Sequence, residues 1–258
     1  MCFDLDSRPP IAPIAGGSLD HGSIVLTASD GNRFLAFRAR PAHPSGAAIV
    51  ILPDVRGLHP YYEELALRFA ETGVDALAID YFGRTAGVDA ARDDAFEFMP
   101  HVQHTTIAGL TADLRAGAVE LRNGDAGPPS ALFTVGFCYG GRLAFGTPTL
   151  GLGLAGAIGF YGSPVGAHAS GTPIPTEVAA AMECPVLGIF GGADASIPPA
   201  DIATFETALA SASVDHQLIT YPGAPHSFLD RKAADFGTES NAAWEASLAF
   251  IREHTDRE

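Results

Sequence analysis

Cysteine is scarce in this chain of 258 residues, which holds only Cys2, Cys138 and Cys184. Three scattered thiols exclude a disulfide framework, and without a C-x-x-C pair they favour neither a zinc site nor a dithiol redox centre. Cys184 precedes Pro185 and an apolar run, where a buried structural thiol is the ordinary interpretation. Cys2 stands in a terminus that we expect to be loose. Cys138 is therefore the thiol whose surroundings need a chemical explanation.

Positive charge is also scarce, because 15 Lys and Arg face 30 Asp and Glu, for a net charge of -15. Nucleic-acid binding depends on neutralising phosphates with Lys and Arg, so we expect no nucleic-acid partner. The sequence has no apolar run of about 18 residues, the length that indicates a membrane span, so we expect no membrane partner. The N-terminus is acidic where a secretory signal would be basic. The simplest expectation is a cytoplasmic protein, either a monomer or a small homo-oligomer.

The composition, 47% hydrophobic and 17% charged, is typical of a compact globular chain. Its length suits one α/β domain, which we place at residues 21–258. Residues 1–20 are rich in Pro and Gly with little periodicity, and they predict an extended N-terminal arm to which we give no chemistry. A second pattern, two strand-like runs joined through 29–32, predicts an antiparallel hairpin at the edge of a sheet.

Short apolar runs alternate with helical patterns from residue 47 onward, which predicts a mostly parallel sheet with helices on both faces. The expected central strands are 47–52, 74–79, 131–135, 155–160, 186–190 and 216–221. The expected helices are 61–71, 106–121, 139–145, 199–210 and 241–252. Two longer excursions, 83–103 and 162–183, exceed ordinary loop lengths and are candidates for lids or binding loops.

The strongest chemical signal is Gly136-Phe137-Cys138-Tyr139-Gly140, which lies between a predicted strand and a predicted helix. This is the setting of a nucleophile elbow, with cysteine in place of the usual serine and small residues where the backbone is crowded. The following helix points its N-terminus at the sulfur and so favours the thiolate. The amide of Tyr139 can face a developing oxyanion. A bare G-x-C-x-G also arises by chance in a chain with 29 glycines, so its partners decide.

An acid and a base follow Cys138 where an α/β-hydrolase would place them. Asp194 comes shortly after the predicted strand 186–190, and His226 shortly after the strand 216–221. In these enzymes the nucleophile, acid and base follow in that order along the chain, each just past a strand. Asp194 alone could be a turn residue or cap, and His226 a solvated loop histidine. The three together predict a triad in which Asp194 orients His226, the base toward Cys138.

Metal ligands are not indicated, because His101 and His104 form an i, i+3 pair without a carboxylate and a further ligand. We expect no metal. Tyr161 follows the predicted strand 155–160 and would lie near the pocket mouth, either as a hydrogen-bond donor or as packing.

From about Ser23 to the C-terminus, the sequence resembles the dienelactone hydrolase family of α/β-hydrolases. The motifs that carry the resemblance are Pro53-Asp54-Val55-Arg56-Gly57-Leu58, Gly136-Phe137-Cys138-Tyr139-Gly140-Gly141, Gly191-Gly192-Ala193-Asp194 and Ala224-Pro225-His226-Ser227-Phe228. The resemblance implies a Cys-Asp-His triad, no metal and no organic cofactor. It also implies attack on a small-molecule ester or lactone carbonyl to give a thioester that water hydrolyses.

The resemblance assigns roles next to the thiol as well. Asp54 stands where the family has an acidic residue that contacts the resting thiol and helps to create the thiolate. Many members carry glutamate here, so a loop-capping role for the shorter Asp54 stays open. Val55 N–H would be the second oxyanion donor, beside Tyr139 N–H.

Family members that act on dienelactone hold the substrate carboxylate with arginines. Arg231 matches the arginine that follows the catalytic histidine, and Arg56 is a further candidate. For the other position, Arg92, Phe96 and Met99 keep a helical i, i+4, i+7 spacing, so that one helix face would line a pocket. The alternative is an ordinary amphipathic helix with a solvated arginine.

The leading hypothesis is a cysteine-dependent ester or lactone hydrolase of the carboxymethylenebutenolidase type. A broad carboxylesterase is the runner-up, and it is favoured if the arginines point away from the site, because an anionic substrate needs a positive patch. A hypothesis of another class is a non-catalytic ligand-binding or thiol redox-sensing domain. Asp194 and His226 argue against that hypothesis, since a sensor thiol needs no triad.

Overall fold

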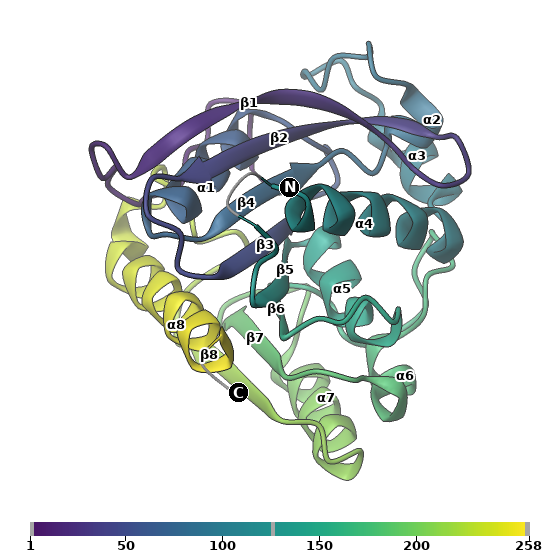
Figure 1. The fold of residues 1–258 in the computed structure, drawn as a ribbon. Coiled ribbons are helices and arrows are strands. Elements are labelled where there is room, and N and C mark those ends of the chain that lie inside the picture. The colour runs from purple at the N-terminus through teal and green to yellow at the C-terminus, as the bar shows by residue number, and fades with distance from the viewer. Residues whose placement is uncertain (1–2, 125–126, 256–258) are drawn as a thin grey trace.

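An eight-stranded sheet covered by helices on both faces forms the core of the computed structural model, which describes residues 3–124 and 127–255 (Figure 1). The strands lie in the order β1-β2-β4-β3-β5-β6-β7-β8. β1 pairs with β2 and β2 with β4 in antiparallel fashion, and the other pairs are parallel. The bounds are β1 Ser18–Thr27, β2 Arg33–Pro41, β3 Ala47–Leu52, β4 Asp75–Ile79, β5 Ala131–Phe137, β6 Gly156–Phe160, β7 Val186–Gly191 and β8 His216–Tyr221. The predicted fold class, with its antiparallel N-terminal edge, is confirmed.

Helices connect the parallel strands, as the alternation of patterns predicts. Their bounds are α1 Pro60–Glu71, α2 Gly83–Ala86, α3 Phe98–His104, α4 Ile107–Arg122, α5 Tyr139–Gly146, α6 Pro175–Val178, α7 Pro199–Ser211 and α8 Gly237–Thr255. Short 3-10 turns lie at Thr147–Thr149, Ala179–Ala181 and Ala234–Phe236. No helix among the described residues has the length and apolar character that a membrane span needs.

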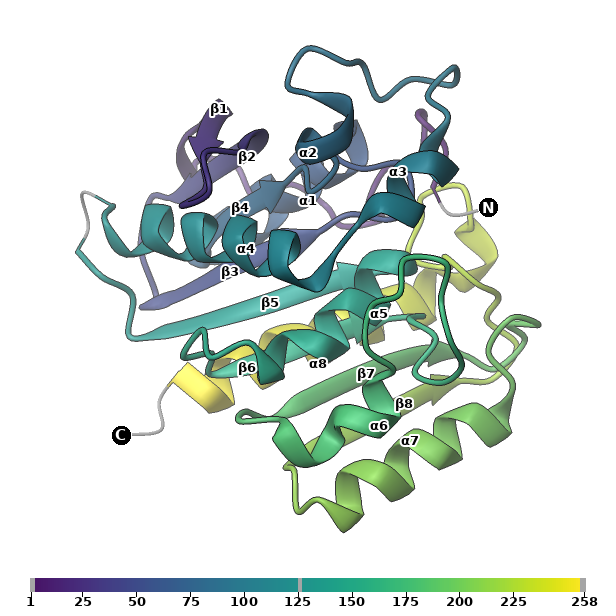
Figure 2. The same cartoon turned by 90° about the vertical axis from the view of Figure 1, so that its right-hand side faces the viewer.

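The two faces of the sheet build two hydrophobic cores. In β3, Ile49 and Ile51 pack with residues of α1 and α8 on one face, while Val50 and Leu52 pack with residues of α4 on the other. Helices α4 and α8 accordingly lie on opposite sides of the sheet (Figure 2). All six β3 side chains are buried, because helices cover this central strand on both sides. Each fully buried aliphatic side chain of this kind contributes roughly 1.5–3 kcal/mol relative to exposure. The central strands therefore form a rigid platform for the loops at their ends.

The helical spacing of Arg92, Phe96 and Met99 proves to be a wrong indication, because residues 87–97 form no helix and α3 begins only at Phe98. Asp93 explains the difference. Its carboxylate accepts the Ala95 N–H at 2.9 Å, and its carbonyl accepts the Phe96 N–H at 3.1 Å. Such local bonds to an aspartate compete with the helical hydrogen-bond ladder. The helix expected to carry all three residues is therefore absent, so neither of its two expected roles applies.

The N-terminal segment runs along the domain before it enters the sheet. Phe3 is buried, and the Ile14 N–H donates to Glu71 at 2.9 Å. β1 begins at Ser18, five residues before the start of the apolar run that predicts the hairpin. The extra residues have one large apolar side chain, the exposed Leu19, so they lack the hydrophobic pattern, but their backbone continues the pairing with β2.

Candidate active site

The parallel strands have their carboxyl ends at the end of the sheet where α5 begins (Figure 2). Loops at that end line a cavity of about 500 Å³. Ligand sites of α/β sheets form at this edge because the connecting loops converge there. The cavity is lined by Val55, Cys138, Tyr139, Arg142, Tyr161, Ser163, His168, Asp194, Ala195, Ser196, Ile197 and His226. The three residues predicted as a triad thus share one cavity, although they lie far apart in sequence.

Cys138 is held in a strained turn between β5 and α5. Its φ of 55° and ψ of -113° lie in a region that residues other than glycine seldom adopt. Its N–H donates to the Phe160 carbonyl at 2.9 Å, and its own carbonyl accepts the Arg142 N–H at 3.0 Å. These bonds hold the half-buried thiol at the start of α5. The first backbone N–H groups of a helix have no partner within it and point along its axis, beyond its N-terminal end.

Two glycines make this turn sterically possible. A Cβ added at Gly136 would lie 2.9 Å from the Gly141 nitrogen and closer still to the Gly140 carbonyl. One added at Gly140 would lie 2.8 Å from the Leu52 carbonyl carbon and closer still to the Leu52 and Pro53 oxygens. A side chain at Gly136 would therefore clash with the first turn of α5, and one at Gly140 would separate the turn from the end of β3.

The imidazole and the acid form a hydrogen-bonded pair, with His226 Nδ1 2.6 Å from Asp194 Oδ2. The other Asp194 oxygen, Oδ1, accepts the Ser196 N–H at 2.9 Å and the Ser196 hydroxyl at 2.5 Å. Burial by itself raises the pKa of Asp194, but the hydrogen bonds from His226 and Ser196 outweigh it and place this pKa below the usual 3.8. Asp194 is therefore a buried carboxylate that stays ionised and orients the ring.

Val55 and Tyr139 lie on the cavity wall beside Cys138, whereas Asp54 is fully buried and outside the lining. The Asp54 carboxylate accepts the Phe3 N–H at 3.1 Å and the Arg56 N–H at 2.8 Å. The second of these bonds is the loop-capping arrangement that the sequence left open. The residue next to the oxyanion loop is thus tied to the backbone on both sides.

The arginines expected to hold a substrate carboxylate lie outside the cavity, each beside a carboxylate of the protein. Arg231 contacts Glu64 at 2.9 Å. Arg56 contacts Asp94 at 3.2 Å and Asp4 at 3.6 Å. Arg92 is buried against Asp80 at 2.5 Å, and its guanidinium lies 4.4 Å from the centre of the Phe96 ring. The structure does not bring these side chains to Cys138.

Tyr161, by contrast, lies in the cavity wall, buried and with a positive φ of 40°. Its ring centre is 5.2 Å from that of His226 and 5.5 Å from that of Phe228. Tyr161 therefore packs directly against the imidazole and limits the orientations the ring can take.

Sequence reasoning missed the wall formed by Arg142 and His168. Arg142 is buried, and its guanidinium donates to the carbonyls of Ser163, Val165 and Gly166 at 2.8, 3.0 and 2.7 Å. Burial lowers the pKa of Arg142, and burial together with the Arg142 charge lowers the pKa of His168. Arg142 comes four positions after Cys138, about one helical turn, which was the signal available in the sequence.

His168 stacks on the ring of Tyr139, with ring centres 4.8 Å apart and planes inclined by 19°. It belongs to the excursion 162–183, which the sequence singled out as a candidate binding loop. This excursion therefore supplies a wall of the cavity, as expected for a loop of that length.

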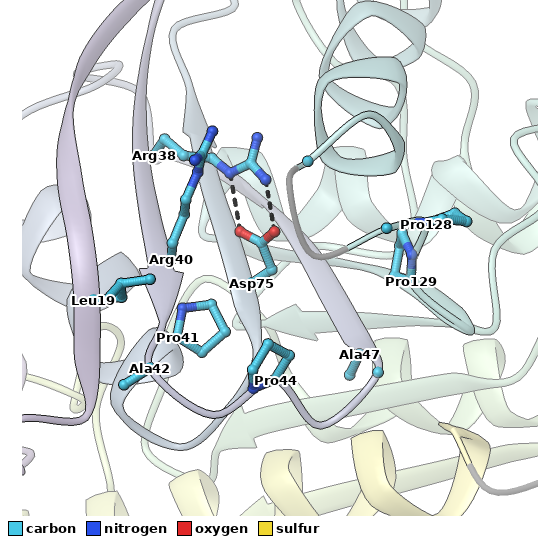
Figure 3. Close-up of a pocket in the computed structure, with 13 residues that line it drawn as sticks. Leu19, Arg38, Arg40, Pro41, Ala42, Pro44, Ala47, Asp75, Pro128 and Pro129 are labelled. Atoms are coloured by element: carbon cyan, nitrogen blue, oxygen red, sulfur yellow. Dashed lines mark hydrogen bonds and ion pairs between the residues drawn. The ribbon is translucent and has the colours of Figure 1, made fainter.

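A second cavity, of about 380 Å³, lies at the opposite end of the sheet, where β3 and β4 begin (Figure 3). Its lining includes several prolines and the pair formed by Arg38 and Asp75, joined by bonds of 2.9 and 2.6 Å. Of the residues described there, none offers a nucleophile next to a base. Elsewhere in the described ranges, no group of three or more His, Cys, Asp or Glu is arranged to hold a metal ion.

Comparison with known proteins finds relatives along most of the chain. A family model described as "Dienelactone hydrolase family" matches residues 34–255. A protein of Salmonella typhimurium, provisionally named carboxymethylenebutenolidase, is 27% identical over 95% of this chain and 93% of its own length. One of Methylorubrum extorquens with the same name is 29% identical over 86% of this chain and 76% of its own. A crystal structure of a provisionally named dienelactone hydrolase from Klebsiella pneumoniae superposes with a TM-score of 0.77, at 26% identity, covering 91% of this chain and 99% of that one.

Proposed function

The chain belongs to the dienelactone hydrolase family, and from this premise we propose that it hydrolyses carboxylic esters or lactones with Cys138 as nucleophile. The observation that carries the proposal is the 2.6 Å bond between His226 and Asp194, in the cavity that also exposes the strained Cys138. A strained nucleophile, a base and an orienting acid are the parts that covalent acyl transfer requires.

In the first half of the proposed reaction, His226 takes the thiol proton and the Cys138 thiolate attacks the carbonyl carbon. The carbonyl electrons move to oxygen, and the Val55 and Tyr139 amides donate hydrogen bonds to that oxyanion. When the tetrahedral intermediate collapses, the bond to the alcohol oxygen breaks and His226 returns the proton to that oxygen. The products are a thioester on Cys138 and an alcohol, which stays attached to the acyl group if the substrate is a lactone.

In the second half, His226 takes a proton from a water molecule, whose oxygen attacks the thioester carbonyl. Collapse of the second tetrahedral intermediate breaks the carbon–sulfur bond, frees the carboxylic acid and returns the proton to the thiolate. Asp194 stabilises the imidazolium in both halves, because its lowered pKa keeps it ionised. The start of α5 places backbone N–H groups near the sulfur, which favours the thiolate.

The test is hydrolysis of a small activated ester and of a carboxylated lactone by the wild type and by Cys138→Ala. We expect kcat to fall by at least about 1000-fold, since loss of a triad nucleophile costs that much or more. Cys184→Ala is the matched control, because it removes a buried thiol outside the cavity and should keep full activity. Equal rates in the wild type and Cys138→Ala would eliminate the proposal and leave a binding or redox-sensing role for the thiol.

A second candidate, a carboxylesterase that prefers uncharged esters, is favoured by the placement of the arginines. Arg231, Arg56 and Arg92 each contact a carboxylate of the protein outside the cavity. The Arg142 side chain, which does line it, donates to three backbone carbonyls. An anionic substrate would thus meet no exposed guanidinium among the described lining residues.

Arg231→Ala tests this second candidate. If the substrate is uncharged, KM for a carboxylated lactone and for the same lactone without the carboxylate should both stay within about twofold of wild type, since no binding interaction specific to the anion is removed. A KM that rises about tenfold or more for the carboxylated lactone alone would restore Arg231 as an anion-binding residue.

A further inference from the structure

We infer that residues 3–9, called the clasp below, form a positioning part of the active site. The clasp joins the loop that carries Val55 to the loop that carries His226. This inference rests on the proposed function, because it concerns the alignment of the same oxyanion donor and base. None of the clasp residues lines the catalytic cavity, so their effect is exerted through the two loops.

Phe3 anchors the clasp in the core beneath the site. Its side chain is 1% exposed and stacks on Tyr61, with ring centres 3.8 Å apart and planes inclined by 14°. It also lies 6.2 Å from the ring of Phe137, the residue before Cys138, and 6.4 Å from the ring of Tyr161. Phe3 thus lies beside Phe137, which precedes Cys138, and beside Tyr161, which packs on His226.

The Phe3 backbone reaches the oxyanion loop directly. Its N–H donates to Asp54 Oδ2 at 3.1 Å, while Asp54 Oδ1 accepts the Arg56 N–H at 2.8 Å. The Asp54 carbonyl, which belongs to the same peptide group as the Val55 N–H, accepts the Tyr81 hydroxyl at 2.6 Å. A buried carboxylate that loses one of its donors must rotate or attract water. Either change would loosen the loop that presents the Val55 N–H.

The remainder of the clasp pairs with the chain just after His226. The Ser7 hydroxyl donates to Asp230 Oδ2 at 2.5 Å, and the Arg8 N–H donates to Asp230 Oδ1 at 3.3 Å. The Arg231 N–H returns a bond to the Arg8 carbonyl at 2.8 Å.

The buried Tyr61 side chain adds a further link between Phe3 and the loop after His226. The Tyr61 hydroxyl, on the residue that stacks with Phe3, donates to the Leu229 carbonyl. The start of the described chain accordingly lies beside the loop that leads into α8 (Figure 2). The clasp thus holds the oxyanion loop and the histidine loop in one arrangement. The exposed ion pairs of Lys232 with Asp4 and Asp6 add little, since water screens them.

The distinguishing measurement separates kcat from KM. The Val55 bond to the oxyanion and the proton transfer by His226 both act in the transition state. Misplacing either group should therefore lower kcat and leave KM nearly unchanged. We expect Phe3→Ala to lower kcat about 10- to 100-fold, since shifts of about 1 Å cost this much. Phe3→Leu, which keeps most of the buried volume, should recover most of the rate.

Phe69→Ala is the matched control for loss of a buried ring. Phe69 is also 1% exposed, and it packs on Trp244, with ring centres 4.6 Å apart, outside the cavity lining. It should lower the unfolding temperature about as much as Phe3→Ala but keep the wild-type kcat. A milder pair is Ser7→Ala and Ser247→Ala, which each remove a buried hydroxyl bond and of which only the first should lower kcat.

Cys138→Ala, measured on the same ester, separates the two proposals. If Cys138→Ala is inactive while Phe3→Ala and Ser7→Ala keep the wild-type kcat, the clasp is only structural and this inference is overturned. Equal kcat losses in Phe69→Ala and Phe3→Ala would overturn it as well. If Phe3→Ala does not fold, the Ser7→Ala and Ser247→Ala pair decides. Full activity of Cys138→Ala would instead refute the proposed function.

Discussion

Gly140→Ala is a one-atom test of how tightly the elbow and the oxyanion loop are fitted together. The new Cβ would lie 2.8 Å from the Leu52 carbonyl carbon, whereas ordinary contact begins at 3.4 Å, so the turn and the end of β3 must separate by at least 0.6 Å. The Leu52 and Pro53 carbonyl oxygens are closer still, which requires more. Pro53 leads directly into the Val55 loop, so the separation moves the oxyanion donor away from Cys138.

From the rate cost of about 100-fold for a 1 Å misplacement, we expect kcat to fall roughly 10- to 100-fold. Overpacking of this kind also costs about 1–3 kcal/mol of stability, equivalent to a fall of roughly 2–12 °C in Tm for a chain of this size. Both quantities can be measured on one preparation, by steady-state hydrolysis of an activated ester and by thermal unfolding.

Gly146→Ala is the control from the same helix. An added Cβ there meets no heavy atom within 4 Å, and φ of -86° with ψ of -20° is helical. Removing the flexibility of glycine should therefore stabilise the protein by about 0.4–1 kcal/mol without changing kcat. If Gly140→Ala matched Gly146→Ala in both kcat and Tm, the close fit of elbow and oxyanion loop would be disproved.

Three further predictions concern the titratable groups Asp194 and Cys184. Asp194→Asn should lower kcat roughly 10³- to 10⁴-fold, because the amide does not hold His226 in the tautomer that the base requires. Since the pKa of Asp194 is lowered, its contribution to stability is complete above the ordinary value of 3.8 and is lost as pH falls through the lower folded value. Urea unfolding measures the difference in unfolding free energy between wild type and Asp194→Asn, and this difference should become smaller only below about pH 4. A difference that already shrinks near pH 6 would contradict the lowered pKa of Asp194. Burial raises the pKa of Cys184 to about 12. In a Cys2→Ser variant at pH 8, iodoacetamide should therefore label Cys138 and leave Cys184 unmodified, as peptide mass spectrometry would show. Fast labelling of Cys184 would show that this thiol is not buried.

The pattern along the chain was enough to predict the architecture. Strands β3 and β8 have the predicted bounds, and β4 differs by one residue. For β3 and β4 the reason is that a strand buried on both faces leaves a continuous apolar run. The positions of Cys138, Asp194 and His226, just after β5, β7 and β8, also predicted their meeting, since parallel strands end at one edge of the sheet. Local sequence carries this information because strand direction and turn position are local properties.

Which charges face one another was decided only by the tertiary structure. Arg231 meets Glu64 and Arg92 meets Asp80, and in each case the partner comes from another segment of the chain. Nothing in the spacing of the arginines distinguishes a guanidinium that faces a substrate from one that neutralises a carboxylate of the protein, because the Coulomb energy depends on distance in space.

The N-terminal arm is the clearest such case. Its Pro- and Gly-rich composition predicted an extended segment without chemistry, yet Phe3 is buried against Tyr61 and its N–H meets Asp54, 51 positions away in the chain. A lone aromatic residue in an aperiodic segment carries no signal of where it packs. The sequence by itself therefore determined the sheet, the elbow and the residues after each strand. The folded chain determined what surrounds them, because a buried contact requires a site of complementary shape that only the assembled elements create.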